Sequence, residues 1–405
     1  MQLQKYDIKP ELLESFDLVS FINKYRNVST NDFILKDKTN FSIDKNLLAE
    51  QLKLNFKLSN KIPTFYAANC WLSSKSFEQA SGEKSALYKA SLFSGKKLLD
   101  VCGGLGVDDW AFSARFDTIV SIDIDSYLNV LVNHNFNKLK LNNTRRITAD
   151  AYLFLKDTRE QYDLIYIDSD RRVNNKKGFR FDDIEPAYSK IEGRLKELTN
   201  HVLLKLSPLI DISYCVNHLE NLKSIHVVAH DGEVKEVLCE IDYSISSNQN
   251  DVKIVAVDIE DHNTRHFSST FSKQQNGILA NDYTFAFFYE ASSAIVKAGL
   301  CQEYGKSLEL LSLSIQTSYF VSNSKLDDFM GRRFDIVKAF AFSKKSLKEY
   351  LKTNNIIKAN VSRNQFPVSP EEIKKQFQIR DGGDEYLFFT SQSNGEKLVL
   401  HCRKI

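Results

Sequence analysis

The chain has 405 residues, which is long for one compact core, and its 42% hydrophobic and 26% charged content excludes a mainly disordered protein. Its 54 basic and 52 acidic residues leave a formal charge of +2, which excludes a polybasic protein that binds nucleic acid with its whole surface. Any anionic partner must therefore meet a local patch.

The first part of the chain is predicted to be helical. Residues 11–25 and 46–61 place Leu, Ile and Phe at steps of three and four, and Pro63 breaks the second run. We expect residues 1–88 to form a helical N-terminal cap.

From Lys96 the pattern changes to short apolar runs separated by amphipathic segments. Six of these runs are predicted strands, at 96–102, 118–123, 145–150, 162–168, 201–207 and 224–230. An Asp-Gly turn then returns the chain into a seventh strand, which we expect to be antiparallel. Residues 89–247 are therefore predicted to form an α/β domain, a largely parallel sheet with helices on both faces.

After Asn248 the chain no longer follows strand-helix-strand order. We expect a helix over residues 290–305 and an aromatic strand at 318–322, within a segment that spans 248–330. The last part, 331–405, has the pattern β-α-β-α-β-β, which indicates a small α+β module.

Cysteine usage bears on compartment and metal binding. The six cysteines are scattered, with no C-x-x-C pair and no Cys/His cluster at zinc-ligand spacing, so we expect neither disulfides nor a metal site. No stretch approaches the roughly 18 apolar residues of a membrane span, and no apolar run follows a basic start at the N-terminus. We expect a reduced, cytoplasmic protein with no membrane partner and no obligate protein partner.

A glycine-rich loop, DVCGGLG at 100–106, closes the first predicted strand of the sheet and opens a helix. Glycines let the backbone approach a ligand, and the helix N-terminus favours negative charge. A dinucleotide dehydrogenase would need a third glycine at Asp109, whose side chain is expected to obstruct helix-strand packing and repel a pyrophosphate. The loop therefore disfavours that class.

Acidic residues end three successive strands and favour an adenosine ligand that carries no phosphate. Asp123 lies where a ribose diol is bound, Asp100 can accept from a ligand ammonium, and Asp150 can accept from an adenine amino group. With Gly104 and Gly106 they form one cofactor-binding set. This set resembles the class I S-adenosylmethionine-dependent methyltransferase pattern, with Cys102 in place of the first glycine of the acidic-x-Gly-x-Gly-x-Gly loop.

The resemblance extends from Phe77 to the C-terminus and is to a bacterial methyltransferase family with a C-terminal THUMP-like domain. It rests on residues 77–109 and on GFRFDDIEP, LLKLSPLID, GEVKEV, YEASSAIVKAG, GRRF and FPVSPEEI. It implies a Rossmann-like seven-stranded methyltransferase sheet, S-adenosyl-L-methionine as cofactor, an intermediate ferredoxin-like segment, and a THUMP-like module whose relatives bind RNA. It also implies that Gln79 and Asp108 lie near the methionine end of the cofactor.

The end of the fourth predicted strand is where a methyl acceptor should lie. The family pattern there is nearer Asp-Pro-Ala-Arg-Arg, so Asp168, Arg171 and Arg172 carry over, whereas Ser169 and Asp170 replace Pro and Ala. We take Asp168 and Arg171 as candidate catalytic residues, with Asp168 accepting a proton or hydrogen bond from the substrate. An equal alternative is that Asp168 only caps the next turn.

A basic run follows this turn, at the expected catalytic rim. Arg172, Lys176, Lys177 and Arg180 are candidate substrate-binding residues, because a polyanion would be steered to that edge. Residues 344–405 hold 12 Lys/Arg against 7 Asp/Glu, a local excess of five basic residues. Both patches favour RNA as the partner.

The sequence thus predicts an S-adenosylmethionine-dependent methyltransferase that acts on an RNA base, in tRNA or rRNA. Two alternatives stay open. A metal-dependent small-molecule O-methyltransferase is one, because the turn at 168–171 is similar to the Asp-Ala-Asp-Lys turn of those enzymes. The other is a non-catalytic RNA-binding scaffold with a methyltransferase fold, because the prolines and aromatic typical of base-amine methyltransferases are missing at this turn.

Overall fold

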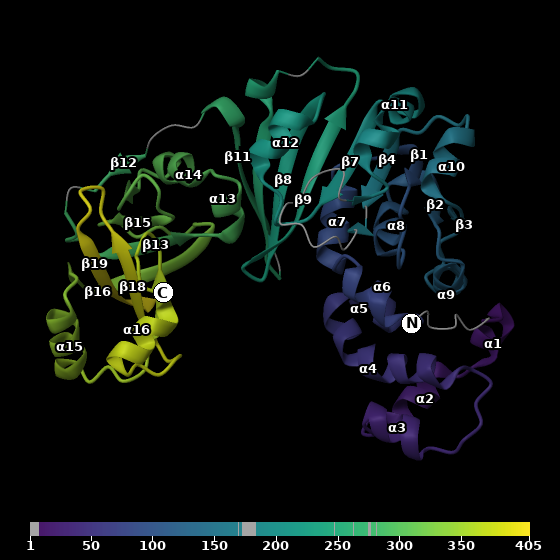
Figure 1. The fold of residues 1–405 in the computed structure, drawn as a ribbon, viewed down its shortest axis with the longest axis horizontal. Helices are drawn as coiled ribbons and strands as arrows, with labels where there is room; N and C mark the ends of the chain where they lie inside the picture. Colours follow the sequence, from purple (N-terminus) through teal and green to yellow (C-terminus); the bar gives the residue numbers. More distant parts are fainter. Residues whose placement is uncertain are drawn as a thin grey trace. The chain divides into compact units, whose positions relative to one another are not determined.

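The computed structural model describes residues 8–168, 170–171, 184–246, 248–261, 263–273, 277–280 and 282–405, without the side chains of 170, 171 and 273. The chain forms two compact units, one of residues 1–223 and 238–246 and the other of 224–237 and 247–405 (Figure 1). The boundaries at 88, 247 and 330 stay a prediction.

Seven helices precede the first strand in the described residues: α1 (Pro10–Ser15), α2 (Leu18–Tyr25), α3 (Thr30–Lys36), α4 (Lys45–Lys61), α5 (Pro63–Ala67), α6 (Ser74–Gln79) and α7 (Glu83–Ser91). The helix expected over 11–25 is divided in two, because the Asp17 side chain accepts from the Ser20 backbone N–H and starts a new helix. Pro63 ends α4 as expected and takes the first position of α5, where its missing N–H costs nothing.

An extended segment at Trp71 and Leu72 connects α5 to α6 and is held by two amide side chains. Gln51 of α4 donates to the Leu72 carbonyl at 2.8 Å and accepts from its N–H at 2.9 Å. Asn135 makes the same pair of bonds to Trp71, at 2.8 and 2.7 Å. All four residues are buried, so these two amides replace a neighbouring strand for this segment.

The larger sheet has nine strands, in the order β11-β10-β8-β9-β7-β4-β1-β2-β3. Their bounds are β1 (Gly95–Asp100), β2 (Phe116–Asp123), β3 (Thr144–Thr148), β4 (Leu164–Asp168), β7 (His201–Leu206), β8 (Leu222–His230), β9 (Glu233–Asp242), β10 (Lys253–Ile259) and β11 (Thr264–Thr270). Strands β3, β2, β1, β4 and β7 pair with one another in parallel, in that order. The expected α/β class is confirmed.

The sheet is wider by two strands than the seven expected. Strand β10 pairs in parallel with β8 and antiparallel with β11, although both added strands come from the segment 248–330. Burial accounts for the places of these two strands in the sheet. Most of β10 is buried, as in an internal strand, whereas every residue of β11 is at least partly exposed, as at an edge. Asp231 and Gly232, at φ 54° and 76°, form the expected hairpin turn between β8 and β9.

Helices follow the carboxyl ends of the strands: α8 (Val107–Phe112), α9 (Ser126–Lys138), α10 (Ala151–Asp157), α11 (Tyr188–Leu198) and α12 (Ile212–His218). Aspartates accept from backbone N–H groups at the starts of three of them, Asp125 for α9, Asp150 for α10 and Asp211 for α12. A two-stranded ribbon, β5 (Asp170–Arg171) and β6 (Ile184–Glu185), precedes α11.

The second sheet has eight strands, in the order β12-β14-β15-β13-β16-β19-β18-β17. Its elements are β12 (Ile278–Leu279), β13 (Phe287–Ala291), α13 (Ser293–Lys297), α14 (Cys301–Ser307), β14 (Leu311–Ser312), β15 (Tyr319–Ser322), β16 (Gly331–Ala341), α15 (Lys344–Thr353), β17 (Asn360–Arg363), α16 (Pro370–Phe377), β18 (Glu385–Ser391) and β19 (Lys397–Lys404). The expected β-α-β-α-β-β order of the last six is confirmed. The single helix expected over 290–305 is two helices, which separate at Gly299 with φ 73°.

Three further findings concern membrane spans, cysteines and metal sites. Among the described residues, no helix is both long and apolar enough to cross a membrane. None of the six cysteines forms a disulfide bond, and four of them are buried. In the same part of the chain, no three His, Cys, Asp or Glu side chains gather as a metal site requires.

The amide bonds at Trp71 give a test of the fold. Asn135→Ala leaves the buried N–H and C=O of Trp71 without partners, so we expect it to lower the free energy of unfolding by about 2–3 kcal/mol. Urea titration measures this loss, and exposed Asn142→Ala, as the control, should change it by less than about 0.5 kcal/mol. Equal effects of the two substitutions would contradict the assigned role.

Candidate functional site

A pocket of about 230 Å³ opens at the carboxyl ends of β1 and β2. Its walls come from α6 and the turn after it, from the glycine loop, and from the ends of β2 and β4. The structure brings together most of the predicted site residues in these walls: Gln79, Asp100, Gly104, Gly106, Asp108, Asp123 and Asp168. Trp71 and Leu72, which Asn135 and Gln51 hold, lie just before α6. These hydrogen bonds therefore also position one wall of the pocket.

The glycine loop is fixed to the end of β2 by backbone hydrogen bonds. The Gly104 N–H donates to Asp123 Oδ2 at 3.0 Å, and the Asp125 N–H donates to Asp123 Oδ1 at 2.9 Å. Gly106 has φ 79°, and a Cβ there would lie 2.6 Å from the Phe136 ring, so only glycine fits. The loop therefore places the Asp123 carboxylate in the pocket wall.

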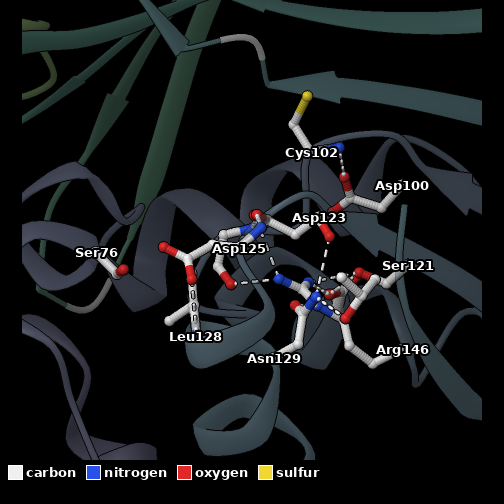
Figure 2. A network of polar contacts seen from close by, with 12 residues as sticks. Ser76, Asp100, Cys102, Ser121, Asp123, Asp125, Leu128, Asn129 and Arg146 are labelled. Atoms are coloured by element: carbon white, nitrogen blue, oxygen red, sulfur yellow. Dashed lines mark hydrogen bonds and ion pairs between the residues drawn. The ribbon is translucent and has the colours of Figure 1, made fainter. Parts of the chain in front are cut away.

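Arg146 of β3 connects the loop, the end of β2 and helix α9 (Figure 2). Its Nη2 donates to the Gly104 carbonyl at 2.7 Å and lies 3.4 Å from Asp123 Oδ2. Its Nε donates to Asn129 Oδ1 at 2.7 Å, and Nη1 donates to Ser121 Oγ at 2.8 Å. The guanidinium is entirely buried, and such a group needs these partners because an unpaired buried charge is costly. The sequence did not single it out.

Asp109 is also taken up by this network. The carboxylate is fully buried, with Oδ2 accepting from Ser121 Oγ at 2.6 Å and lying 3.3 Å from Arg146 Nη1. The expectation that its side chain obstructs packing is wrong, because Arg146 and Ser121 accommodate it. Burial raises the pKa of Asp109 to about 6, although Arg146 lowers it.

Asp100 lies beneath the loop with 1% of its surface exposed, and its Oδ1 accepts from the Cys102 N–H at 2.9 Å. Burial, and next the neighbouring Asp109, raise the pKa of Asp100 well above its usual value. This favours its uncharged form, which is a weaker partner for a ligand ammonium than a carboxylate.

Asp108 has the opposite electrostatics. Lys89 of α7 is entirely buried, with Nζ 3.0 Å from Asp108 Oδ1. Asp108 Oδ2 accepts from the Tyr166 hydroxyl at 2.9 Å and from Ser81 Oγ at 3.0 Å. Burial alone would raise the pKa of Asp108, but the Lys89 and, next, Lys205 charges outweigh it, and the pKa lies below its usual value.

Lys89 and Tyr166 are residues that the sequence reasoning missed. Both lie in apolar patterns, Lys89 in a helix and Tyr166 within a buried strand, where a core position is the default interpretation. A lysine on the buried face of an amphipathic helix was the one available signal.

Asp168 ends β4, and its side chain is 26% exposed. The strand register places it beside Lys205 of β7, whose Nζ lies 2.6 Å from Asp168 Oδ2. The carboxylate therefore lies in the pocket wall with a fixed cation next to it.

Asp150 is not among the residues that line the pocket. Its Oδ1 accepts from the Leu153 N–H at 3.0 Å and caps α10. Ile124, directly after Asp123, does line the pocket, and 71% of it is exposed, which is unusual for an apolar residue of this size. The role of Asp150 toward an adenine stays a prediction.

Of the predicted basic rim, only Arg171 lies within the described residues. Its backbone pairs with that of Ile184 in the β5-β6 ribbon. The candidate substrate-binding residues Arg172, Lys176, Lys177 and Arg180 lie outside the described residues. Their roles, like that of Arg171, stay predictions.

A larger concavity of about 630 Å³ lies between α10 and α11 and contains none of the predicted site residues. Lys156, Arg159 and Lys190 line it, and none of the three has an ion-pair partner within the described part of the chain. Arg194 also lines it but is engaged, donating to the Leu155 carbonyl at 2.8 Å. Among the described residues that line the concavity, Glu197 is the one acid against four cations, so this lining is net positive.

Comparisons with known proteins agree with this architecture. Residues 331–404 match the family model described as THUMP domain-like. The fold is similar to that of a candidate methyltransferase from Porphyromonas gingivalis W83, at 27% identity and a TM-score of 0.87, over 98% of this chain and 99% of that chain. No curated protein matches the chain.

Two weaker likenesses are to TrmK of M. capricolum, solved with S-adenosyl-homocysteine, and to a candidate class I S-adenosylmethionine-dependent methyltransferase from Listeria monocytogenes. The first has 14% identity and a TM-score of 0.30, over 44% of this chain and 71% of that chain. The second has 8% identity and a TM-score of 0.34, over 59% of this chain and 91% of that chain. Likenesses this weak support no conclusion.

Gly103 tests the packing of the loop on Arg146. A Cβ there would lie 1.9 Å from Arg146 Nη1 and 2.2 Å from Ser121 Oγ, so Gly103→Ala must displace a buried, fully bonded guanidinium. We expect a loss of roughly 1–3 kcal/mol in the free energy of unfolding by urea titration. Gly193→Ala in α11 meets open space and, as the matched control, should gain about 0.5–1 kcal/mol. A neutral Gly103→Ala would refute the close approach.

Proposed function

Since this chain combines a methyltransferase fold with a C-terminal THUMP-like domain, we propose that it transfers a methyl group from S-adenosyl-L-methionine to an RNA base, in tRNA or rRNA. When bound, the cofactor supplies a methyl group on a sulfonium, which an acceptor atom displaces in line. The acceptor loses a proton as its bond to the methyl carbon forms. The protein's task is to hold the two reactants in line and to receive that proton or its hydrogen bond.

The observation that carries the cofactor proposal is the acidic wall beside a glycine loop. Five aspartates line the pocket, at 100, 108, 123, 125 and 168, and Lys75 is the one cation among the described lining residues. A nucleotide phosphate would be repelled there, whereas an adenosine that carries a sulfonium and an ammonium would be attracted. The pocket's charge thus favours the same ligand class as the strand-end pattern.

The individual residues suit the parts of that ligand. Asp123 uses only part of its acceptor capacity on the Gly104 and Asp125 N–H groups and on Arg146, and its remaining lone pairs suit ribose hydroxyls. The exposed face of Ile124 suits a planar adenine ring, which would cover it. Gln79 and Asp108 remain the candidates for the methionine end.

Asp168 is the candidate acceptor for the substrate's proton or hydrogen bond. Lys205 fixes one carboxylate oxygen at 2.6 Å, so the other oxygen is held in a defined direction at the pocket wall. The Lys205 ammonium also argues against the metal-dependent alternative, because it takes the place beside Asp168 where a divalent ion would bind.

RNA as the substrate is supported by charge and by the THUMP-like match. The concavity between α10 and α11 offers three cations that have no ion-pair partner among the described residues and that suit a phosphate backbone. The residues matched to the THUMP-like model lie in the basic C-terminal part of the chain. Cytoplasmic localisation stays a prediction.

Calorimetry with S-adenosylmethionine tests the cofactor half. We expect the wild type to bind and Asp123→Ala to bind at least about tenfold more weakly, because a hydrogen-bond acceptor for the ribose is lost. Asp117→Ala, an exposed acid on the same strand, is the control and should bind like the wild type. Absence of wild-type binding, or undiminished binding by Asp123→Ala, would sink the proposal.

Tritium transfer from labelled S-adenosylmethionine tests the substrate half, with RNA from cells that lack the protein. We expect label in RNA, and we expect Asp168→Asn to lower kcat by about 10²–10⁴ while cofactor affinity stays within about threefold. Activity should survive a chelator. Label in small molecules with chelator sensitivity would favour the O-methyltransferase, and binding without any transfer would favour the scaffold.

A further inference from the structure

Lys89 is an entirely buried cation near the pocket. Its side chain has no exposed surface, and it lies on α7, outside the glycine loop and the strand ends. Besides facing Asp108, its Nζ donates to Ser81 Oγ at 2.7 Å and lies 5.8 Å from the centre of the Tyr166 ring. A lysine in such a place is costly unless its charge has a purpose-made partner.

Asp108, the partner of Lys89, reaches the pocket. It is one of the lining residues, and its side chain is 10% exposed. Lys89 forms an ion pair at Oδ1, and Ser81 and Tyr166 donate to Oδ2, so contacts from three separate segments fix the carboxylate's orientation. Ser81 also lines the pocket and connects Lys89 to the carboxylate through its hydroxyl.

Asp108 lines the pocket and stays charged despite its burial, so it can meet a ligand cation. Asp100, by contrast, is inclined to its uncharged form. The charged and titratable groups that face Asp108 are Lys89, Lys205, Tyr166, Asp100 and Asp109. The two acids oppose its ionisation and the two lysines favour it.

We propose that Lys89 is a positioning residue that keeps the Asp108 carboxylate charged and oriented, so that it binds the ammonium group of the methionine part of the ligand. The ligand half of this inference rests on the proposed function, whereas the charge pairing does not. Lys89 itself does not touch the ligand. It acts only through Asp108.

Stability as a function of pH, without ligand, tests the charge pairing. In the wild type the lowered pKa means that ionised Asp108 adds stability above its unfolded pKa, and this is lost as pH falls through the folded pKa. In Lys89→Met, burial is no longer outweighed and the folded pKa is raised. Ionised Asp108 then destabilises the fold, so lowering the pH restores stability.

The comparison is made within pairs that differ only at Asp108. We expect Lys89→Met to gain stability over Lys89→Met/Asp108→Asn as pH falls from about 8 to about 5, whereas the wild type should gain none over Asp108→Asn. Parallel pH profiles for the two pairs would overturn the proposal. If Lys89→Met does not fold, Tyr166→Phe replaces it. Losing one donor to Asp108 Oδ2 should move the acid-side loss of stability to higher pH. No movement of that loss would overturn the proposal.

Calorimetry with S-adenosylhomocysteine, which carries the same ammonium group, tests the ligand half. We expect the affinity of Lys89→Met relative to wild type to fall by about tenfold more at pH 6 than at pH 8, because protonation of Asp108 removes the ammonium's partner. Exposed Lys57→Met should match the wild type at both values. Taking the ratio to wild type cancels titration of the ligand's own amine.

The outcomes separate the two claims. A loss that is equal at both pH values would mean a merely structural lysine and would overturn the inference. A wild type that does not bind S-adenosylhomocysteine would overturn the proposed function and with it the ammonium role, while the ligand-free profiles still decide whether Lys89 holds Asp108 in its charged form.

Discussion

The buried guanidinium of Arg146 is the contact on which the candidate site depends. A single side chain bonds to the Gly104 carbonyl, to Ser121 in β2 and to Asn129 in α9, and it lies beside the Asp123 carboxylate. The loop, the end of β2 and the helix after it therefore cannot move independently. Because removing one partner of a buried charge leaves the other unpaired, the network is expected to respond as a unit.

The same arrangement, an aspartate beside a cation, recurs around the pocket. Asp123 has Arg146, Asp108 has Lys89 and Asp168 has Lys205, each at 3.4 Å or less, and each cation comes from a different element of the fold. A wall of aspartates could not otherwise lie so close together, since like charges at short range repel and raise each other's pKa values. Burial and the neighbouring Asp109 raise the pKa of Asp100, and the Arg146 charge offsets this only in part. Asp100 and Asp108 thus differ, because burial inclines Asp100 to its neutral form whereas the Lys89 and Lys205 charges favour the ionised form of Asp108.

Sequence patterns predicted the parts of this arrangement that lie on strand ends and turns. Asp100, Asp123 and the loop glycines were found because strand-loop-helix order puts them at one edge of a sheet. Arg146 was not found, because in the doublet with exposed Arg145 only the alternation of faces along β3 distinguishes the buried residue, and hydropathy does not. Lys89 was missed for a similar reason.

The fold beyond the site shows the same limit. The C-terminal β-α-β-α-β-β order could be predicted because each element has its own periodicity and caps. The joining of β10 and β11 to the larger sheet could not, because an apolar run does not specify which strand it pairs with. Asp109 likewise was expected to obstruct packing, and only the position of Arg146 explains why it does not.

A crystal structure of the full chain grown with S-adenosylhomocysteine tests the central claim most directly. The account predicts the ligand in the pocket beside the glycine loop, with its ribose hydroxyls within hydrogen-bonding distance of Asp123 and its adenine over Ile124. A ligand bound elsewhere, or one that leaves Asp123 without a contact, would contradict it.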